Sequence, residues 1–352
     1  MDEKFVSLGI DTSNYRTSAA VFGSSAAHKR ELLPVKNGSL GLRQSEAVFL
    51  HTKALPNIIK ELITENGVDF NTVKSIGVSA YPRDELNSYM PCFLVGKSAG
   101  EILSAVYNIP LYNFSHQCGH IAAAVYSAQS DFKNETEETE EIKEIKLSNI
   151  NNIKETKKVK ENLKLLKEKF IAMHISGGTT ECLLVTPGEN IISCKKIAGT
   201  LDLNAGQVID RIGVKLGFDF PSGIYLEKFL NNNFNYIKTK PAFKNGCCCL
   251  SGLENKCNEL IFKKDKIYAV SYLFSYISDI LINFTENTVK AYGELPVVFS
   301  GGVMANGFIK NILCEKLNNK LNIRLALSEF SGDNALGTAI LSAIKNGEDL
   351  WS

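Results

Sequence analysis

The sequence lacks an excess of charge and two of the motifs that define large enzyme classes. Its 352 residues include 39 basic and 38 acidic side chains, which gives a net charge of +1. Because proteins that hold nucleic acid through their overall charge are strongly basic, the composition does not indicate such a partner. A Walker loop and an HExxH pattern are both absent, which argues against a P-loop NTPase and against a zincin peptidase.

An uninterrupted hydrophobic run of membrane-spanning length is also missing. The most apolar segment, IYAVSYLFSYISDILINF, is broken by serine and aspartate at helical spacing, and it predicts a buried helix rather than a membrane span. The opening residues MDEKFVSLGID carry acids where a signal peptide has a basic stretch. We therefore expect a cytoplasmic protein that does not enter a membrane.

The cysteines lack the pattern of a disulfide framework. Nine cysteines, an odd number, are scattered through apolar segments without a CxxC pair, which indicates reduced thiols. Cys247, Cys248 and Cys249 are adjacent in the chain. Neighbouring residues on a strand point to opposite faces, so we interpret these three as packing residues rather than joint ligands of one metal ion.

Length and an internal repeat predict two related domains. A domain typically has about 150 residues, so the chain accommodates two domains and an insertion. FVSLGIDTSNYRTSAAVF (residues 5–22) contains two β-rich runs around a polar turn, which predicts a hairpin with an acid, Asp11, at its tip. FIAMHISGGTTECLLV (residues 170–185) repeats the strand–turn–strand layout. The repeat indicates duplicated halves.

A charged block separates the two copies of this repeat. We predict an N-terminal domain at 1–127, completed by a C-terminal helix at 335–352, and a second domain at 170–334. The low-complexity insertion at 128–169 holds seven acids from Asp131 to Glu144 and seven lysines from Lys154 to Lys169. Such a block usually stays solvated. The alternative is a basic arm that contacts phosphates.

The strongest local signal is a pair of histidines four residues apart. Ser115-His116-Gln117-Cys118-Gly119-His120 opens a predicted helix, so both imidazoles lie on one face and can reach one metal ion. Such pairs also occur by chance, and this one lacks the glutamate that activates water in zincins. Asp333, before the last helix, is the best candidate for a third ligand. The alternative is that Asp333 caps that helix.

Two glycine turns have the features of a phosphate site. Ser176-Gly177-Gly178-Thr179-Thr180 joins two predicted strands, and Ser300-Gly301-Gly302-Val303-Met304-Ala305-Asn306 follows a strand and opens a helix. Glycine lets backbone amides approach an anion, and a helix N-terminus adds partial positive charge. Each turn alone is as often only a tight turn. Together with the acidic hairpin, the two turns favour a nucleotide held between the duplicated domains.

A further polar stretch, AGTLDLNAGQVIDRIGVKLGFDFPSG, predicts one long helix that ends at Gly217. Asp202 and Asp210 lie eight residues apart and would share one face of that helix. Asp210 is therefore a candidate acceptor for ribose hydroxyl groups. The alternative is an ordinary solvated helix face.

These motifs resemble those of a known family, the universal tRNA threonylcarbamoyladenosine transferases of the actin, sugar-kinase and heat-shock-ATPase superfamily. The matching segments follow the family order over nearly the whole chain outside 128–169: LGIDTS, FLVGKSAGEILSAVYNIPLYNFSHQCGHIAAA, HISGGTTE, GTLDLNAGQVIDRIGVKLGFDFPSG, LSGL, FSGGVMANGFIKNIL and GDNALGTA. The resemblance implies an α/β fold of two duplicated actin-like, sugar-kinase-like domains with a cleft between them.

The resemblance also implies a site. It assigns one divalent metal ion, iron or zinc, to His116, His120 and Asp333, and it assigns no catalytic residue beyond these ligands. The resemblance implies that the acyl-adenylate is contacted by His174, Ile175, Ser176, Gly177 and Gly178. It implies that Asp210 contacts the ribose and that Gly223 and Glu227 contact the sugar or base edge. Asn306 is implied to contact the nucleotide.

The reaction implied by the resemblance is a group transfer. The threonylcarbamoyl group passes from threonylcarbamoyl-AMP to the exocyclic amine of the adenosine next to the anticodon, in tRNAs that read codons starting with A, and AMP is released. The implied partners are threonylcarbamoyl-AMP, tRNA and proteins of the same pathway, namely a paralogous actin-like subunit and an ATPase subunit.

Several segments depart from the family pattern. The loop from Tyr81 to Pro91 stands where the family has a glycine-proline-glycine loop, and Asn14–Arg16 replace an acidic pair. Glu254 stands in place of a lysine and Ser222 in place of a glycine. We interpret the chain as a divergent paralogue. Two alternatives to the tRNA reaction therefore stay open: a related transferase with another acceptor, and a non-catalytic nucleotide-binding subunit.

Overall fold

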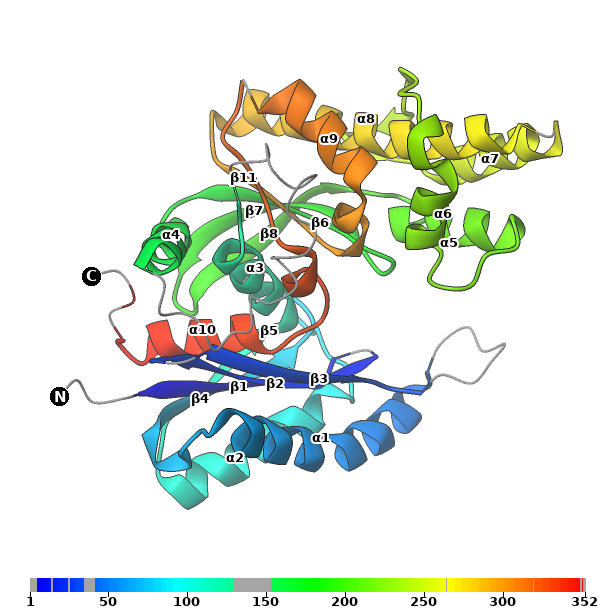
Figure 1. The fold of residues 1–352 in the computed structure, drawn as a ribbon. Helices are drawn as coiled ribbons and strands as arrows, with labels where there is room; N and C mark the ends of the chain where they lie inside the picture. Colours follow the sequence, from blue (N-terminus) through cyan, green and yellow to red (C-terminus); the bar gives the residue numbers. More distant parts are fainter. Residues whose placement is uncertain are drawn as a thin grey trace.

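Two five-stranded sheets form the framework of the described part of the chain (Figure 1). The structure, a computed structural model, describes residues 5–13, 15–24, 26–34, 42–129, 153–263, 265–318, 320–348 and 350. The first sheet has the order β3-β2-β1-β4-β5 and consists of β1 Val6–Asp11, β2 Arg16–Gly23, β3 Ala26–Leu32, β4 Val73–Tyr81 and β5 Leu111–Ser115. β1, β2 and β3 form antiparallel pairs in that order, whereas β4 and β5 continue the sheet in parallel from β1.

The second sheet repeats this topology strand for strand. Its order is β8-β7-β6-β11-β12, with β6 Phe170–Ile175, β7 Thr180–Gly188, β8 Ile191–Gly199, β11 Val297–Ser300 and β12 Ile323–Leu325. β6, β7 and β8 are antiparallel, and β11 and β12 continue in parallel from β6. Both strand order and strand direction match those of the first sheet, so the predicted duplication is confirmed.

Helices cover the two faces of the first sheet. α1 (Gln44–Asn66) and α2 (Phe93–Tyr107) lie on one face, and α10 (Leu336–Lys345) lies on the other (Figure 1). Alternate strand residues point to opposite faces. Ile10 of β1 accordingly packs with Leu62 of α1 in one hydrophobic cluster, and Ala20 of β2 packs with Ile340 of α10 in another.

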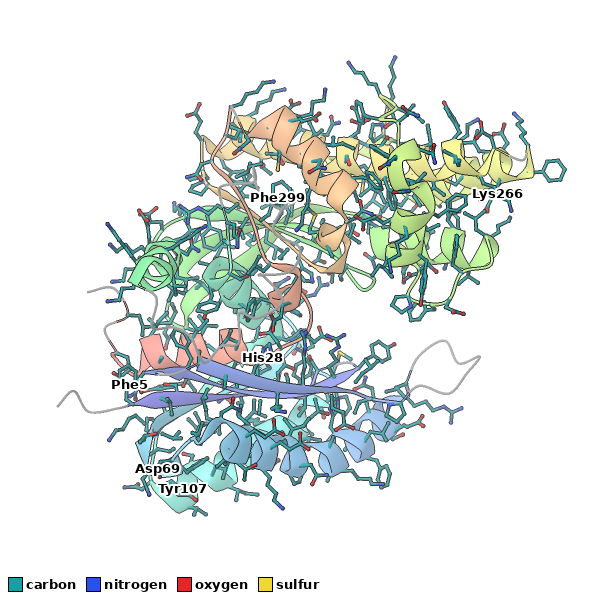
Figure 2. All side chains as sticks on the ribbon, in the orientation of Figure 1. Phe5, His28, Asp69, Tyr107, Lys266 and Phe299 are labelled. Atoms are coloured by element: carbon teal, nitrogen blue, oxygen red, sulfur yellow. The ribbon has the colours of Figure 1, made fainter. Side chains whose placement is uncertain are left out.

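The second half carries its own layer of helices. They are α5 Ala205–Lys215, α6 Gly223–Leu230, α7 Ser251–Phe262, α8 Lys266–Tyr292 and α9 Gly307–Leu317, with the small hairpin β9 Phe243–Lys244 and β10 Cys247–Cys248. Short 3-10 turns lie at η1 Phe70–Thr72, η4 Leu165–Lys167, η5 Asn231–Asn233, η6 Gly302–Ala305 and η7 Ser328–Phe330. In Figure 2, Lys266 marks the far end of this half, and Asp69 and Tyr107 mark the opposite end of the molecule.

α8 contains the most apolar segment of the sequence. By length and composition it is the one helix of the described residues that could cross a membrane, but 72% of its most apolar window is buried inside the protein. Phe274, Ile277 and Phe284 belong to the core of the second half. The prediction of a buried core helix is therefore confirmed.

The two helices that end the halves cross each other between the sheets. α3 (His116–Tyr126) follows β5, α10 follows β12, and both contribute to one hydrophobic cluster with strands of the two sheets. A Cβ built at Gly337 of α10 would lie 1.8 Å from the carbonyl oxygen of Gly119 in α3. Only residues without a side chain permit so close a crossing. This crossing brings the start of α3 next to the loop before α10.

The end of the charged block between the halves is folded. Residues 130–152, which include its acidic part, lie outside the described residues. α4 (Ile153–Lys164) and η4 follow, and Leu163, Leu165 and Leu166 are at most 3% exposed. Asn162 donates a hydrogen bond to the carbonyl oxygen of Ala128, 2.7 Å away. The expectation of a solvated block is therefore wrong for the end of the segment, because its leucines pack into the core shared with α3.

Candidate metal and nucleotide site

The start of α3 presents two histidines side by side. Ser115 caps the helix, since its Oγ accepts a hydrogen bond from the backbone nitrogen of Cys118 at 3.1 Å. The cap fixes the first turn, and the four-residue spacing then places His116 and His120 on one face. Their Nε2 atoms are 2.8 Å apart, and both side chains are buried.

Asp333 completes this group from the second half of the chain. Its Oδ1 lies 3.1 Å from Nε2 of His120 and 3.6 Å from Nε2 of His116. The cap position of α10 is Ala335 rather than Asp333, so the capping alternative is wrong. The structure therefore brings together His116, His120 and Asp333, which the sequence predicts as metal ligands.

The geometry of these three atoms fits a divalent ion. Zinc-type ions bind histidine nitrogen and carboxylate oxygen at about 2.0–2.2 Å, so donor atoms around a tetrahedral ion are about 3.3 Å apart. The three observed separations, 2.8, 3.1 and 3.6 Å, lie around this value. Two imidazole nitrogens and one carboxylate are a donor set suited to iron or zinc.

A second carboxylate, Asp11 at the tip of the first hairpin, supports His116 from behind. Asp11 Oδ2 lies 2.7 Å from Nδ1 of His116, and the aspartate is only 1% exposed. The backbone nitrogen of Ser13 and the Oγ of Ser79 also donate to Asp11. A proton on Nδ1 of His116 is thereby held by Asp11, and Nε2 is the ring nitrogen that faces Asp333 and His120. This is the carboxylate–histidine pairing typical of metal sites.

The charges around His116 favour a cation. Burial lowers the pKa of His116, but the charges and hydrogen bonds of Asp11 and Asp333 outweigh it and raise that pKa to about 10. Burial likewise raises the pKa of Asp333, yet its contacts with His116 and His120 hold that pKa well below the usual range. The buried carboxylate of Asp11 and the partly exposed carboxylate of Asp333 place negative charge around the two imidazoles, which a metal ion would balance.

The two glycine turns lie against each other beside this cluster. Gly301, at the end of β11, has a φ of 99°, and a Cβ there would lie 2.2 Å from the carbonyl oxygen of Ile175 at the end of β6. Within the described part of the chain, an added Cβ at Gly177 or Gly178 would have no atom within 4 Å, so this turn is open on its outer side. The Oγ of Ser176 accepts hydrogen bonds from the backbone nitrogens of Gly178 and Thr179.

His174 links the turns to the metal cluster. Its ring centroid lies 4.8 Å from that of His120, and its Nδ1 lies 3.1 Å from the Oγ of Ser300. Burial, and then the charge of His120, hold the pKa of His174 well below its usual value, so its imidazole is neutral. The side chain of Ile175 is fully buried in the core. Of the predicted contacts, Ile175 can therefore offer a ligand only its main chain.

The other residues predicted to contact the nucleotide lie on α5, on α6 and at the start of α9. Asp210 Oδ1 accepts a hydrogen bond from the backbone nitrogen of Ser222 at 2.7 Å, just before Gly223 opens α6. Glu227 Oε1 accepts one from the backbone nitrogen of Gly307 at 2.8 Å. Asn306 caps α9 through its Oδ1.

Asn306 also carries an unsatisfied donor. Its Nδ2 is buried and has no hydrogen-bond partner among the described residues. A buried donor without a partner costs free energy. A bound ligand that accepts this hydrogen bond would remove the cost, in agreement with the predicted nucleotide contact.

One prediction for this region is wrong. α5 begins at Ala205, so Asp202 lies before the helix and does not share a face with Asp210. The carboxylate of Asp202 instead accepts hydrogen bonds from the backbone nitrogens of Leu250 and Ser251 at the start of α7. The sequence pattern missed this role because the two segments meet only in the folded chain.

Sequence reasoning also missed an ionic contact beside the cluster. Glu181, next to the first glycine turn, is 4% exposed, and Arg83 Nη1 lies 2.7 Å from its Oε1. Lys196 and Gln117 also contact this carboxylate. Arg83 belongs to the loop from Tyr81 to Pro91, so the divergent loop is tied to the second half immediately beside the histidines.

The chain contains a GxSxG sequence, Gly96-Lys97-Ser98-Ala99-Gly100. In hydrolases this motif forms a sharp turn between a strand and a helix that exposes the serine. Here it lies inside α2. The structure therefore gives Ser98 no nucleophile elbow.

The paired sheets, the crossed final helices and the two glycine turns define an actin-like, sugar-kinase-like α/β protein. Full-length HypF, solved in a phosphate- and nucleotide-bound form, aligns with a TM-score of 0.58 and 13% identity over 100% of this chain and 57% of that one. HypF of T. kodakarensis aligns with a TM-score of 0.57 and 11% identity, over 99% of this chain and 49% of that one. At such identity the likeness shows the fold alone, and the predicted fold class is confirmed.

Sequence comparisons identify the family. The family model of tRNA N6-adenosine threonylcarbamoyltransferase matches residues 153–340, and the match begins where α4 begins. A relative of that name from Thermosipho melanesiensis is 28% identical over 347 residues, 95% of this chain and 92% of its own length. Another, from Lactobacillus gasseri, is 24% identical over 85% of this chain and 78% of its own length. The chain belongs to the tRNA N6-adenosine threonylcarbamoyltransferase family.

Proposed function

We propose that the protein transfers the threonylcarbamoyl group from threonylcarbamoyl-AMP to N6 of the adenosine next to the anticodon, in tRNAs that read codons starting with A. The name of its relatives supports modification of tRNA adenosine in general. The finer proposal rests chiefly on one observation. His116, His120 and Asp333 converge within 3.6 Å, directly beside two adjoining glycine turns.

The proposal includes one divalent ion, iron or zinc, held by His116, His120 and Asp333. Such an ion, when bound, supplies a Lewis acid that polarises the carbamoyl oxygen or holds the leaving phosphate. Asp11 holds the proton on Nδ1 of His116 and so fixes the orientation of that ring.

The donor would lie along the two glycine turns. Gly177 and Gly178 have no side chains, so a phosphate can approach the main chain of this turn closely. Asn306 offers its unpartnered Nδ2 to the nucleotide. Asp210, whose Oδ1 is held by the Ser222 amide, can accept a ribose hydroxyl group at its other oxygen.

The proposed chemical step is an acyl transfer. The exocyclic amine of adenine attacks the carbamoyl carbon, and a new N–C bond forms. The bond between this carbon and the phosphate oxygen breaks, AMP leaves with the electron pair, and the amine loses one proton. Donors fixed in a buried site can stabilise the charge that develops on the carbamoyl oxygen and the phosphate.

Partner proteins are part of the proposal. Leu94, Ile102 and Val106 are 46%, 64% and 71% exposed, and they belong to α2, which lies on the face of the first sheet away from the second half (Figure 1). Such a group of exposed apolar side chains is typical of a contact surface. It supports docking of a paralogous actin-like subunit, which would work with an ATPase subunit. The proposed cytoplasmic location rests on the sequence alone.

The experiment is a tRNA modification assay. The purified protein is incubated with tRNA, a system that generates threonylcarbamoyl-AMP and the partner subunits, and the nucleosides are analysed by mass spectrometry. We expect threonylcarbamoyladenosine with the unaltered protein and with Asp69→Asn, a carboxylate change at the far end of the first half (Figure 2). Asp333→Asn should abolish the product. Absence of product in every combination would contradict the proposal.

A second candidate is the same chemistry on another acceptor. It is favoured by the loop from Tyr81 to Pro91, which replaces the glycine-proline-glycine loop of the family and is held beside the site by Arg83 and Glu181. AMP release measured without tRNA distinguishes the two. Release that depends on Asp333 but not on tRNA would favour the other acceptor, whereas tRNA-dependent release supports the first proposal.

A further inference from the structure

A second cluster of metal-binding side chains lies behind the histidines. Asp84 comes from the loop after β4, Cys118 from the first turn of α3, and Cys194 from β8 of the second half. Their ligand atoms lie within 4.8 Å of one another. The cluster is separate from the histidine cluster, because Cys118 extends from another face of α3 than His116 and His120.

The distances suit a thiolate-bound ion. Cys118 Sγ and Cys194 Sγ are 3.6 Å apart. With zinc–sulfur bonds of about 2.3 Å, two thiolates of a tetrahedral site are about 3.8 Å apart. Asp84 Oδ2 lies 3.1 Å from Cys118 Sγ, at the distance of an S–H···O hydrogen bond.

The cluster is buried on the side of the two cysteines and open to solvent on the side of Asp84. Cys118 and Cys194 are only 2% and 6% exposed, whereas Asp84 reaches solvent. The backbone nitrogen of Cys194 donates to Asp84 Oδ2 at 3.2 Å and orients the carboxylate towards both sulfurs. An ion can therefore enter past Asp84, and a water molecule can supply a fourth ligand on that side.

We propose that Asp84, Cys118 and Cys194 form a second metal site, which takes a thiophilic divalent cation of the zinc class. Two sulfur donors exclude magnesium and calcium, which require oxygen ligands. The site would join the loop from Tyr81 to Pro91, the helix that carries His116 and His120, and a strand of the second half. It would thus fix the divergent loop against the histidine cluster. The proposal does not depend on the reaction proposed above.

Cobalt(II) titration tests this site directly. Cobalt bound by thiolate gives an intense charge-transfer absorption in the near ultraviolet, whereas cobalt bound only by His116, His120 and Asp333 gives none. The reduced full-length protein is titrated with cobalt(II) in the absence of oxygen. We expect the charge-transfer band to saturate at about one equivalent of thiolate-bound metal, to persist in His120→Ala, and to be displaced by zinc.

Three variants and one matched control complete the test. Cys118→Ser and Cys194→Ser should abolish the band, and Asp84→Asn, a change at the open side that should leave folding intact, should weaken cobalt binding at least tenfold. Cys257→Ser, a buried cysteine of α7 outside the cluster, should keep the band. Circular dichroism and thermal unfolding verify that each variant is folded. A reduced, folded protein without the band, or a band that survives in Cys194→Ser, would overturn the proposal.

Discussion

The Nδ1 atom of His116 lies 2.7 Å from Oδ2 of Asp11, and this contact joins the tip of the first hairpin to the start of α3. Ser13 and Ser79 hold the aspartate from two further directions. The ring of His116 is therefore oriented before any ligand binds. The histidine is held by residues that come from β1, β4 and the turn after β1, all belonging to the first half of the chain.

Asp11→Asn tests this orientation. The amide cannot hold the Nδ1 proton as a carboxylate does, so the ring loses its fixed tautomer. We expect metal affinity at His116 and His120 to fall about 10- to 100-fold. Zinc binding measured by calorimetry, with thermal unfolding as the check on folding, gives the result. Asp69→Asn is the matched control, and equal affinities in the two variants would refute the role of Asp11.

Gly337→Ala tests the crossing of α3 and α10. The added methyl group would lie 1.8 Å from the carbonyl oxygen of Gly119, so the two helices must separate. We expect a loss of stability of about 3 kcal/mol, together with loss of metal binding, because Asp333 precedes α10 and moves with it. Gly252→Ala in α7 is the control, since its Cβ meets no atom within 4 Å. Denaturant unfolding of both variants provides the comparison, and equal midpoints would be incompatible with the crossing described here.

Arg83 and Glu181 should be energetically coupled. The carboxylate is nearly buried, but Arg83 is 32% exposed and solvent screens part of the attraction. We expect a coupling free energy of about 1 kcal/mol in a double-mutant cycle with Arg83→Met and Glu181→Gln. The cycle is measured by urea unfolding. Strictly additive effects would show that the ion pair does not hold the loop.

The capping role of Asp202 predicts a pH dependence. Burial raises the pKa of Asp202, but hydrogen bonds from Leu250 and Ser251 outweigh it and lower that pKa to about 2, from 3.8. A lowered pKa in the folded state stabilises the protein above pH 3.8, and the stabilisation is lost as the pH falls towards 2. The difference in urea midpoint between the unaltered protein and Asp202→Asn should therefore be constant above about pH 5 and shrink below pH 4. A difference that grows with acidity would contradict the capping role.

Much of the fold and part of the site could be predicted from local patterns. The two hairpins around Asp11 and around Gly177 predict the duplication, because a strand–turn–strand repeat is visible in a linear sequence. Histidine spacing on α3 likewise fixes which side chains share a face. Asp333 could be proposed as a partner of His116 and His120, and the structure brings the three side chains together.

What could not be predicted depends on contacts between distant segments. Nothing near Asp11 in the sequence indicates that it will face His116, 105 residues away. The pairing of Glu181 with Arg83 and of Asp202 with the start of α7 arises in the same way, from tertiary packing. Composition does not indicate α4 because lysines dominate this segment, whereas the buried leucines Leu163, Leu165 and Leu166 form only a short run at its end.

The central claim is that the cluster of His116, His120 and Asp333 is where threonylcarbamoyl transfer to tRNA takes place. Mass spectrometry of tRNA nucleosides from the reconstituted reaction tests it most directly, with Asp333→Asn and Asp69→Asn compared at equal concentration of folded protein. The account predicts threonylcarbamoyladenosine with Asp69→Asn and none above background with Asp333→Asn. Equal product from both variants would contradict it.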